Sequence, residues 1–466
     1  MAAEKTEVSR PIFHVSKEAV LLVAVLSSFV TPLMAASINI AIPSIGKEFG
    51  LDAILLGWLA TSYSLAAATF LVPFGRVADI YGRRKLLLWG VVVYTVASLM
   101  CAVSTSEAML LAFRVLQGIG AAMQFGTSMA ILTSVYPQQE RGRVLGINVA
   151  SVYVGLSVGP FAGGMMTQYL GWRSIFLLMV PLGLAMVAAI LWGLRGEWAE
   201  ARGEKLDLPG SVMYGASIVV LMYGLTQLPG ALGGILIFMG MVGLLAFVRW
   251  EMRVKNPVLN VALFARNSVF ALSNLAAFVN YTATAAVGFL LSLYLQYLKG
   301  LSPEQTGLVL LAQPVVQAIF SPFAGRLSDR VEPRIVASAG MVLTVIGLVL
   351  FTFLDAQTSQ TYIVGVLLVS GLGFALFSSP NTNAVMSSVE KRYYGVASAT
   401  VGTMRLTGQM LSLGITMLVF AVTMGAVQIT PQYYPVFLGA MRAVFIICTA
   451  LCVVGVFASL ARGKVR

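Results

Sequence analysis

The sequence predicts an all-α integral membrane protein with fourteen transmembrane helices. Hydrophobic residues make up 58% of the 466-residue chain, charged residues only 10%, and the mean hydropathy is +0.88. This composition leaves too little polar surface for a water-soluble domain. The apolar residues are gathered into runs of about 20 or more, the length that an α-helix needs to cross a bilayer. Charged and glycine-containing turns separate these runs.

The predicted spans can be placed along the whole chain. They lie at 19–43, 53–74, 86–104, 108–133, 144–168, 174–194, 208–227, 232–249, 269–296, 304–324, 335–354, 361–386, 395–425 and 435–460. Most of the 30 Lys and Arg residues fall in the tails and in alternate loops, which the positive-inside rule assigns to the cytoplasm. Both termini are therefore expected to be cytoplasmic. The net charge of +12 is explained by topology and by attraction to anionic membrane lipid, without nucleic acid as a partner.

A charged turn occurs twice and divides the chain. Pro-Phe-Gly-Arg-Val-Ala-Asp-Ile-Tyr-Gly-Arg-Arg-Lys occupies 73–85, and the related Pro-Phe-Ala-Gly-Arg-Leu-Ser-Asp-Arg-Val-Glu-Pro-Arg occupies 322–334. Eight spans separate the two copies, which predicts two homologous six-helix bundles with an inserted pair of helices. The expected parts are a tail at 1–18, a bundle at 19–194, a linker at 195–207, a transmembrane hairpin at 208–249, a linker at 250–268, a bundle at 269–460 and a tail at 461–466. Repeated bundles of this kind favour a transporter whose halves rock against each other.

The repeated turn predicts a conformational latch. Gly75 and Gly82 permit close helix approach and tight turning. Asp79 lies beside Arg83 and Arg84, and its expected partners are these cations or a helix N-terminus of the other bundle. The matching latch residues of the second copy are Gly325, Asp329 and Arg330. The alternative is a loop whose charges serve only the positive-inside rule.

Span 5 carries a second motif, a strip of small residues with a proline. Its members are Gly155, Gly159, Pro160, Gly163 and Gly164. The strip permits close backbone contact with a neighbouring helix, and the proline is expected to kink the span. Small residues at this spacing are common in membrane helix pairs, so the motif alone is weak.

Together these motifs resemble the major facilitator superfamily, and within it the fourteen-helix drug:proton antiporter branch. The resemblance covers nearly the whole chain: the loop motif at 75–84, a fourth-helix motif Arg-Val-Leu-Gln-Gly-Ile-Gly at 114–120, and the span 5 motif associated with exporters. Asp207-Leu-Pro-Gly at the start of span 7 and Pro257 before span 9 are similar to the fourteen-helix subgroup. The resemblance implies proton-driven efflux of amphiphilic compounds by alternating access, with the substrate in a central cavity. The absence of targeting signals fits the plasma membrane of a prokaryote.

Two positions depart from the family pattern. Ile80 stands where a basic residue usually follows the loop aspartate, and Met34 stands where span 1 usually carries an aspartate. None of the 18 acidic residues falls at mid-membrane depth in the predicted spans. A proton-coupled exporter ordinarily uses a buried carboxylate, and the lone His14 cannot replace it because it lies in the N-terminal tail. His14 is expected to be an ordinary surface histidine.

Two charges lie well inside the predicted spans, and an intramembrane charge is expensive enough to be treated as functional by default. Arg114 of span 4 can neutralise an anionic substrate or influence a proton-carrying group. Alternatively, Gln117, a backbone carbonyl or water satisfies it structurally. Arg405 of span 13 resembles an arginine that the fourteen-helix branch commonly carries, and a structural role is favoured for it.

Neutral polar side chains within the spans are candidates to line a substrate cavity. Besides Arg114, the candidate substrate-binding residues are Asn39, Gln124, Asn280, Tyr281, Gln313, Gln317 and Asn383. Gln313 and Gln317 are four residues apart and share one helix face. Each of these side chains can instead hydrogen-bond a neighbouring helix, which contributes about 0.6 kcal/mol per pair.

The leading hypothesis is a secondary active exporter of hydrophobic or amphiphilic compounds, with protons as the coupling ion. A second hypothesis is a carrier for organic anions or lipid-like substrates without carboxylate-based proton coupling, motivated by Met34 and Arg114. A third is a membrane receptor or scaffold that keeps the fold without transport. An enzyme is not expected, because the sequence has no nucleophile motif, no metal-spaced cluster and no nucleotide-binding loop. The three cysteines have no metal or redox spacing, and no cofactor is expected.

Overall fold

The computed structural model describes residues 16–259, 261–390 and 394–463, and the regular structure within these ranges is helical. Fourteen helical segments in the described chain are long and apolar enough to cross a membrane. The predicted number of spans is therefore confirmed. The helices run on beyond several predicted spans, because hydropathy marks the apolar part of a helix and not its ends.

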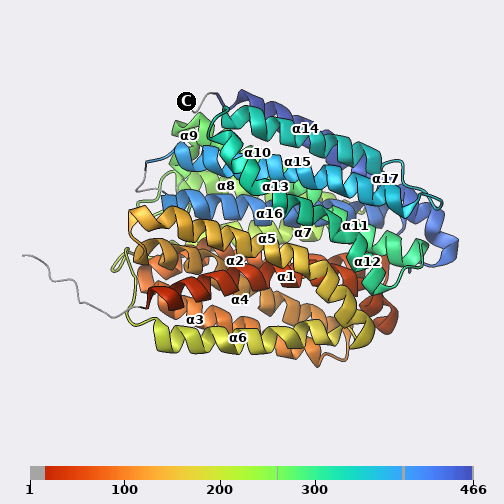
Figure 1. Ribbon diagram of the computed structural model, residues 1–466, viewed down its shortest axis with the longest axis horizontal. Coiled ribbons are helices and arrows are strands. Elements are labelled where there is room, and N and C mark those ends of the chain that lie inside the picture. The colour runs from red at the N-terminus through yellow and green to blue at the C-terminus, as the bar shows by residue number, and fades with distance from the viewer. Residues whose placement is uncertain (1–15, 260, 391–393, 464–466) are drawn as a thin grey trace, which may run out of the picture.

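The first six spans are single helices that pack on one another. They are α1 (Lys17–Phe49), α2 (Ala53–Tyr81), α3 (Arg83–Ala102), α4 (Glu107–Val135), α5 (Gln138–Tyr169) and α6 (Arg173–Gly193). Helix α1 packs mainly against α5, and α3 packs against α4 and α6. Figure 1 shows these helices, red to yellow, in the lower half of the molecule. They are named the N-terminal group.

The C-terminal group contains broken as well as continuous spans. Its elements are α9 (Val261–Arg266), α10 (Ser268–Thr284), α11 (Ala286–Leu293), η1 (Tyr294–Leu298), α12 (Pro303–Leu310), α13 (Ala312–Ser328), α14 (Pro333–Phe351), α15 (Gln360–Ser387), α16 (Tyr394–Thr423), η3 (Pro431–Tyr433) and α17 (Tyr434–Ala461). The ninth span joins α10, α11 and the π-helical turn η1, and the tenth joins α12 and α13. Helices α14 and α15 pack together, as do α10 and α16.

Two further helices, α7 (Leu208–Thr226) and α8 (Ala231–Glu251), form a hairpin between the groups in sequence. Helix α7 packs against α2 of the N-terminal group and α16 of the C-terminal group. The hydroxyl of Tyr214 donates to the carbonyl of Ala68 on α2 at 3.2 Å. Only 17% of the most apolar 18-residue stretch of α8 is buried, so most of the surface of α8 faces outward. The hairpin therefore covers one seam between the two groups and leaves α8 on the outside.

Local signals explain where the helices begin and end. The side chain of Asp52 accepts from the backbone N–H of Leu55 at 2.8 Å and starts α2, and Asp207 starts α7 in the same way. Gly50 ends α1 with φ of 67°, a left-handed conformation that favours glycine. The end at which α1 begins and α17 ends is predicted from the charges to face the cytoplasm and is named the cytoplasmic end. The opposite end is named the external end.

The predicted C-terminal tail needs one correction. Arg462, placed in the tail at 461–466, is fully buried and donates to Asn381 Oδ1 at 2.7 Å, to the carbonyl of Pro333 at 3.0 Å and to Ser273 Oγ at 3.3 Å. Burial lowers the pKa of its guanidinium to about 10, which still leaves it charged at neutral pH. Its charge is held by three helices of the C-terminal group. It was assigned to the tail because it stands two residues beyond the end of the last predicted span.

Candidate functional site

The two groups of helices are joined by hydrogen bonds at the external end. Ser292 of α11 donates to the carbonyl of Asn39 on α1 at 2.6 Å, and Gln296 of η1 donates to the carbonyl of Ile40 at 2.9 Å. Gln296 lies in a π-helical turn, and such turns are frequent at functional sites. These bonds tie α1 to the ninth span and close this part of the external end.

Helices α5 and α12 form a second contact across the groups, built on glycine. A Cβ on Gly164 would lie 2.6 Å from the carbonyl oxygen of Pro303, and one on Gly307 would collide with the carbonyl of Pro160. Only glycine allows the two backbones to come this close. The contact lies towards the external end, which is thus closed on two sides.

The small-residue strip of α5 serves two neighbours. A Cβ on Gly155, Gly159 or Gly163 would lie 2.5–2.6 Å from atoms of α1, whereas Gly164 faces α12. The close helix approach expected of the strip is present. Helix α5 continues through Pro160 from Gln138 to Tyr169.

Between the groups and away from both ends, side chains from five helices gather around Arg405 of α16. The guanidinium carbon of Arg405 lies 4.7 Å from the ring centroid of Phe125 on α4, and Tyr281 of α10 lies within reach of the same guanidinium. The hydroxyl of Tyr153 on α5 is 3.5 Å from that of Ser378 on α15, at the limit of hydrogen bonding. These five residues are named the central cluster. A small molecule held there would touch both groups of helices.

The central cluster combines a cation, aromatic faces and hydroxyl groups. Among the described residues, Arg405 forms no ion pair within 4.0 Å, and its buried Nε has no hydrogen-bond partner. A purely structural arginine within a span is normally paired or bonded to backbone carbonyls. The structural role favoured from the sequence for Arg405 therefore has little support. A guanidinium with free N–H groups can accept an anion.

Arg114 has the satisfied environment that the sequence offered as its alternative. It is buried, donates to Gln117 Oε1 at 2.7 Å and to the carbonyl of Leu59 at 3.3 Å, and lies 4.7 Å from the ring centroid of Tyr63. Gln117 in turn donates to Ser98 Oγ at 2.8 Å. These partners all belong to the N-terminal group, so Arg114 stabilises that group internally.

Two of the other candidate cavity residues join helices within one group. Gln124 is buried and donates to the carbonyl of Gly90 on α3 at 3.2 Å, and Asn383 donates to Ser328 Oγ at 2.8 Å. Their side chains hold α4 to α3 and α15 to α13. A substrate-binding role for these two has no support from their contacts.

Three further candidates lie on spans 9 and 10. Asn280 is fully buried, and neither atom of its side-chain amide has a hydrogen-bond partner among the described residues. A buried amide without partners normally binds a water or a ligand. Gln317 is 5% exposed and Gln313, four residues earlier, is part-buried. Asn280 is therefore the neutral side chain with the clearest unmet hydrogen-bonding capacity.

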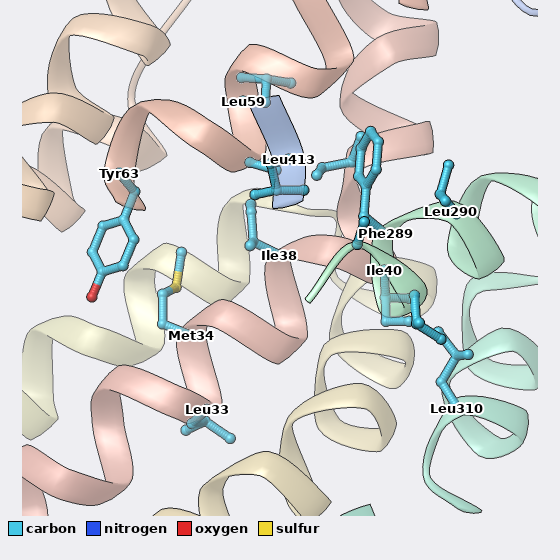
Figure 2. Close-up of a cluster of buried hydrophobic side chains, with 14 of the residues drawn as sticks. Leu33, Met34, Ile38, Ile40, Leu59, Tyr63, Phe289, Leu290, Leu310 and Leu413 are labelled. Carbon is cyan, nitrogen blue, oxygen red and sulfur yellow. The ribbon is translucent and has the colours of Figure 1, made fainter. Parts of the chain in front are cut away.

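Met34 occupies the position at which span 1 usually carries a carboxylate. Figure 2 shows it among Leu33, Ile38 and Tyr63 in a buried hydrophobic cluster, and none of its surface is exposed. An ionised carboxylate in this cluster would carry a large desolvation penalty. The apolar packing of Met34 fits the absence of an acid at this position.

Asp79, the carboxylate of the first charged turn (73–85, called the hinge below), lies in an ionic network on the N-terminal group. Arg83 contacts Asp79 Oδ1 at 2.7 Å, Glu200 Oε1 at 2.8 Å and Ser134 Oγ at 2.9 Å. Of the partners expected for Asp79, the cation in its own turn is present. The contribution of Glu200, from the linker between α6 and α7, was not foreseen.

The linker also holds the start of α3. Glu197 accepts from the backbone N–H groups of Arg84 at 2.7 Å and Lys85 at 3.2 Å, and Glu204 pairs with Arg76. The three glutamates at 197, 200 and 204 are named the linker clasp. The four ion-pair and capping contacts of these glutamates cannot be predicted from sequence spacing, because the linker folds back over a turn more than 100 residues earlier.

The glycines of the hinge differ in their roles. Gly82 has φ of 121°, and a Cβ there would collide with Glu197, so the turn requires glycine. A Cβ on Gly75 would meet no described atom within 4 Å, so the close approach expected at Gly75 is not present. In the second copy, a Cβ on Gly325 would lie 2.9 Å from Ser379 Oγ. Asp329 and Arg330 are exposed just beyond the end of α13.

The fold brings together two carboxyl groups that looked unrelated in the sequence. Asp207 and Glu251, at opposite ends of the hairpin, are 7% and 3% exposed, and oxygens of both crowd the position that a Cβ on Gly210 would take. Asp207 accepts from Trp250 Nε1 at 3.0 Å, and Glu251 Oε2 accepts from the backbone N–H of Leu259 at 3.0 Å. The other oxygen of Glu251 has no hydrogen-bond partner within the part of the chain that the structure describes. A buried acid pair is therefore present, near the cytoplasmic end and not at mid-membrane depth.

Comparison with known proteins decides the family. The Major Facilitator Superfamily pattern matches residues 24–272 and 274–465, almost the whole described chain. The chain belongs to the major facilitator superfamily. His14 precedes the matched region and lies outside the described residues.

Relatives within the major facilitator superfamily are similar over most of their length. The chain is 31% identical over 448 residues to the cephamycin export protein CmcT of Amycolatopsis lactamdurans, covering 92% of this chain and 90% of that protein. It is 31% identical over 397 residues to the multidrug resistance protein Stp of Mycobacterium tuberculosis, covering 84% and 73%. It is 27% identical over 389 residues to the riboflavin transporter RibZ of Clostridioides difficile, covering 83% and 84%.

A solved structure shares the major facilitator fold. The bacterial homologue of the human lysosomal transporter Spinster, in its inward-facing and unoccupied conformation, superposes with a TM-score of 0.70 at 16% sequence identity, covering 96% of both chains. The likeness establishes the fold. The protein is thus a multi-pass membrane transporter of the major facilitator superfamily, and small molecules are its substrates.

Proposed function

We propose that the protein is a secondary active exporter of hydrophobic or amphiphilic small molecules, working by alternating access with protons as the coupling ion. The central cluster carries this proposal. Its side chains come from both groups of helices, so a molecule bound there would change its contacts when the groups rock. Alternating access around a site at the interface of two repeats is the general arrangement in secondary transporters.

The contacts between the groups support the direction of opening. The hydrogen bonds of Ser292 and Gln296 to α1 and the glycine contact of Gly164 with α12 lie towards the external end. The linker clasp, in contrast, holds the cytoplasmic hinge to its own group. A form that receives substrate from the cytoplasm fits these contacts, and the relative CmcT is a cephamycin export protein.

Proton coupling requires a group that changes protonation between the two forms. The described spans carry their acidic residues near the helix ends, and the buried pair of Asp207 and Glu251 is the strongest candidate among them. Two carboxyl groups that share a buried site disfavour double ionisation, which makes this pair a candidate to take up and release a proton. This pair lies at the cytoplasmic end of the hairpin, whose helix α7 packs against α2 and α16.

The experiment is flux of ethidium, a lipophilic cation, and of an anionic amphiphile in proteoliposomes with an imposed pH gradient. Flux driven by the gradient and abolished by a protonophore is expected. Glu251→Gln should uncouple flux from the gradient, whereas Glu107→Gln, a matched change at an exposed carboxylate, should leave coupling intact. Flux that ignores pH in the unmodified protein would contradict proton coupling, and no flux of either compound would contradict the transport proposal.

One observation favours a second candidate, a carrier for organic anions without carboxylate-based proton coupling. The unpaired Nε of Arg405 in the central cluster attracts anions and repels cations. In the same proteoliposomes this carrier would move the anionic amphiphile whatever the pH gradient, and would not move ethidium.

A further inference from the structure

We propose that Arg405 recognises an anionic group, a carboxylate above all, on a substrate with a flat conjugated body. The inference rests on the proposed transport function, because it assigns the substrate class of the same central site. It applies to an exporter driven by protons and to a passive carrier alike. It concerns what the central cluster selects, and not the source of energy.

The first argument is the unbalanced charge of Arg405. The residue lies between Tyr394 and Thr423, well inside α16, and is part-buried. The ion pairs of the described chain join other residues, and the buried Nε of Arg405 donates to nothing. A part-buried cation gains more from an incoming anion than a solvated one, and no carboxylate of the described residues pairs with Arg405.

The second argument is the geometry around the guanidinium. The ring of Phe125 covers it, with 4.7 Å between the Cζ of Arg405 and the ring centroid. Gly402, one turn earlier on α16, makes room for that ring, since a Cβ there would lie 3.0 Å from Phe125 Cε1. A guanidinium stacked on an aromatic face keeps its N–H groups in the plane and free to bind. That fork matches a carboxylate, which it can bind through two parallel hydrogen bonds.

The third argument is that the C-terminal group also places aromatic side chains near the guanidinium. Tyr281 lies close enough to Arg405 to interact with its charge and meets Phe374 edge to face, with 5.5 Å between ring centroids. Phe125 belongs to the N-terminal group and Tyr281 to the C-terminal group. A flat conjugated body between them would stack on both, and the hydroxyls of Tyr153 and Ser378 would add polar contacts.

The other intramembrane arginine provides a comparison within the same protein. Arg114 already donates hydrogen bonds to Gln117 and to the carbonyl of Leu59. An anion approaching it would have to displace these bonds. Of the two intramembrane arginines singled out in the sequence, Arg405 is therefore the one available for an anionic ligand.

Fluorescein and rhodamine 123 test this proposal, because they share a flat xanthene body and carry opposite charge at neutral pH. Binding to the purified full-length protein in detergent is followed by fluorescence anisotropy. We expect the unmodified protein to bind fluorescein about 10- to 100-fold more tightly than rhodamine 123, the range that one or two charged hydrogen bonds provide. Arg405→Met should remove this preference by weakening fluorescein, without weakening rhodamine 123.

Three further variants make the result specific. Arg405→Lys keeps the charge and loses the planar fork, so it should retain part of the preference. Phe125→Leu should weaken both dyes, because it removes a stacking face. Arg442→Met, at an exposed arginine that donates to the carbonyl of Thr352, should leave both affinities unchanged.

Two results would overturn the proposal. One is equal or tighter binding of rhodamine 123 by the unmodified protein, which needs no variant to interpret. The other is an unchanged fluorescein preference in Arg405→Met or Arg405→Lys that elutes as a monodisperse, helical protein. Flux of both dyes in proteoliposomes distinguishes failure of this proposal from failure of the proposed function. Flux without a preference for fluorescein would contradict this proposal and leave transport standing. Absence of flux for both dyes would contradict the proposed function.

Discussion

Replacing Gln117 by methionine tests the account of Arg114. Methionine has a similar length, but its thioether is only a weak acceptor in place of the Gln117 oxygen that accepts from the guanidinium at 2.7 Å, and it cannot donate to Ser98 Oγ. Arg114 would then keep a single acceptor, the carbonyl of Leu59 at 3.3 Å, while remaining buried. A hydrogen bond to a charged group contributes about 1.5–3 kcal/mol, so the N-terminal group should lose stability of that order.

The assay is thermal unfolding of the purified protein in detergent, followed by circular dichroism. A loss of 1 kcal/mol lowers the melting temperature by about 2–4 °C in units of 150–250 residues, and the N-terminal group is of that size. The expected decrease for Gln117→Met is therefore about 3–12 °C. Gln313→Met is the matched control, because Gln313 is part-buried and its side chain forms no hydrogen bond with a described residue.

The outcome that would refute this reasoning is a melting temperature for Gln117→Met equal to that of Gln313→Met. Arg114 would then be satisfied by water or by lipid, and its burial against Tyr63 would carry no net hydrogen-bond energy. A role for Arg114 at an internal water or a substrate would become the better explanation.

Three other changes test separate parts of the structure. Gly307→Leu should force α12 away from Pro160 and open the external end, seen as a longer distance between spin labels at Glu107 and Thr361; an unchanged distance would contradict the glycine contact. Glu197→Ala removes the acceptor at the start of α3, at a cost of about 0.5–2 kcal/mol, and should speed tryptic cleavage of the linker relative to Glu107→Ala. Arg462→Met leaves buried acceptors of α14 and α15 unpaired and should cost about 1–3 kcal/mol, with exposed Arg442→Met as the control that keeps its melting temperature.

The sequence by itself determined the class, the number of spans and the family. Apolar runs of this length cross the lipid as α-helices, because a helix pairs the backbone N–H and C=O groups of a segment with one another where no water is available. The repeated turn and the glycines of span 5 can be recognised from their spacing in the sequence. The close helix packing that this spacing predicts for span 5 is present at Gly155, Gly159 and Gly163. The ends of the helices were harder to predict from the sequence, because α1 and α2 extend beyond the apolar residues that mark the spans.

Tertiary structure alone decided the partners of the charged and polar side chains. The carboxyl groups of Asp207 and Glu251 are 44 residues apart in sequence and meet only because the hairpin returns to its starting level. The sequence identified Arg114 and Arg405 as intramembrane charges and favoured a structural role for Arg405, but packing gave Arg114 its acceptors and left Arg405 beside Phe125. Hydropathy registers how apolar a segment is, whereas a site depends on which helix faces meet, and that depends on packing between distant segments.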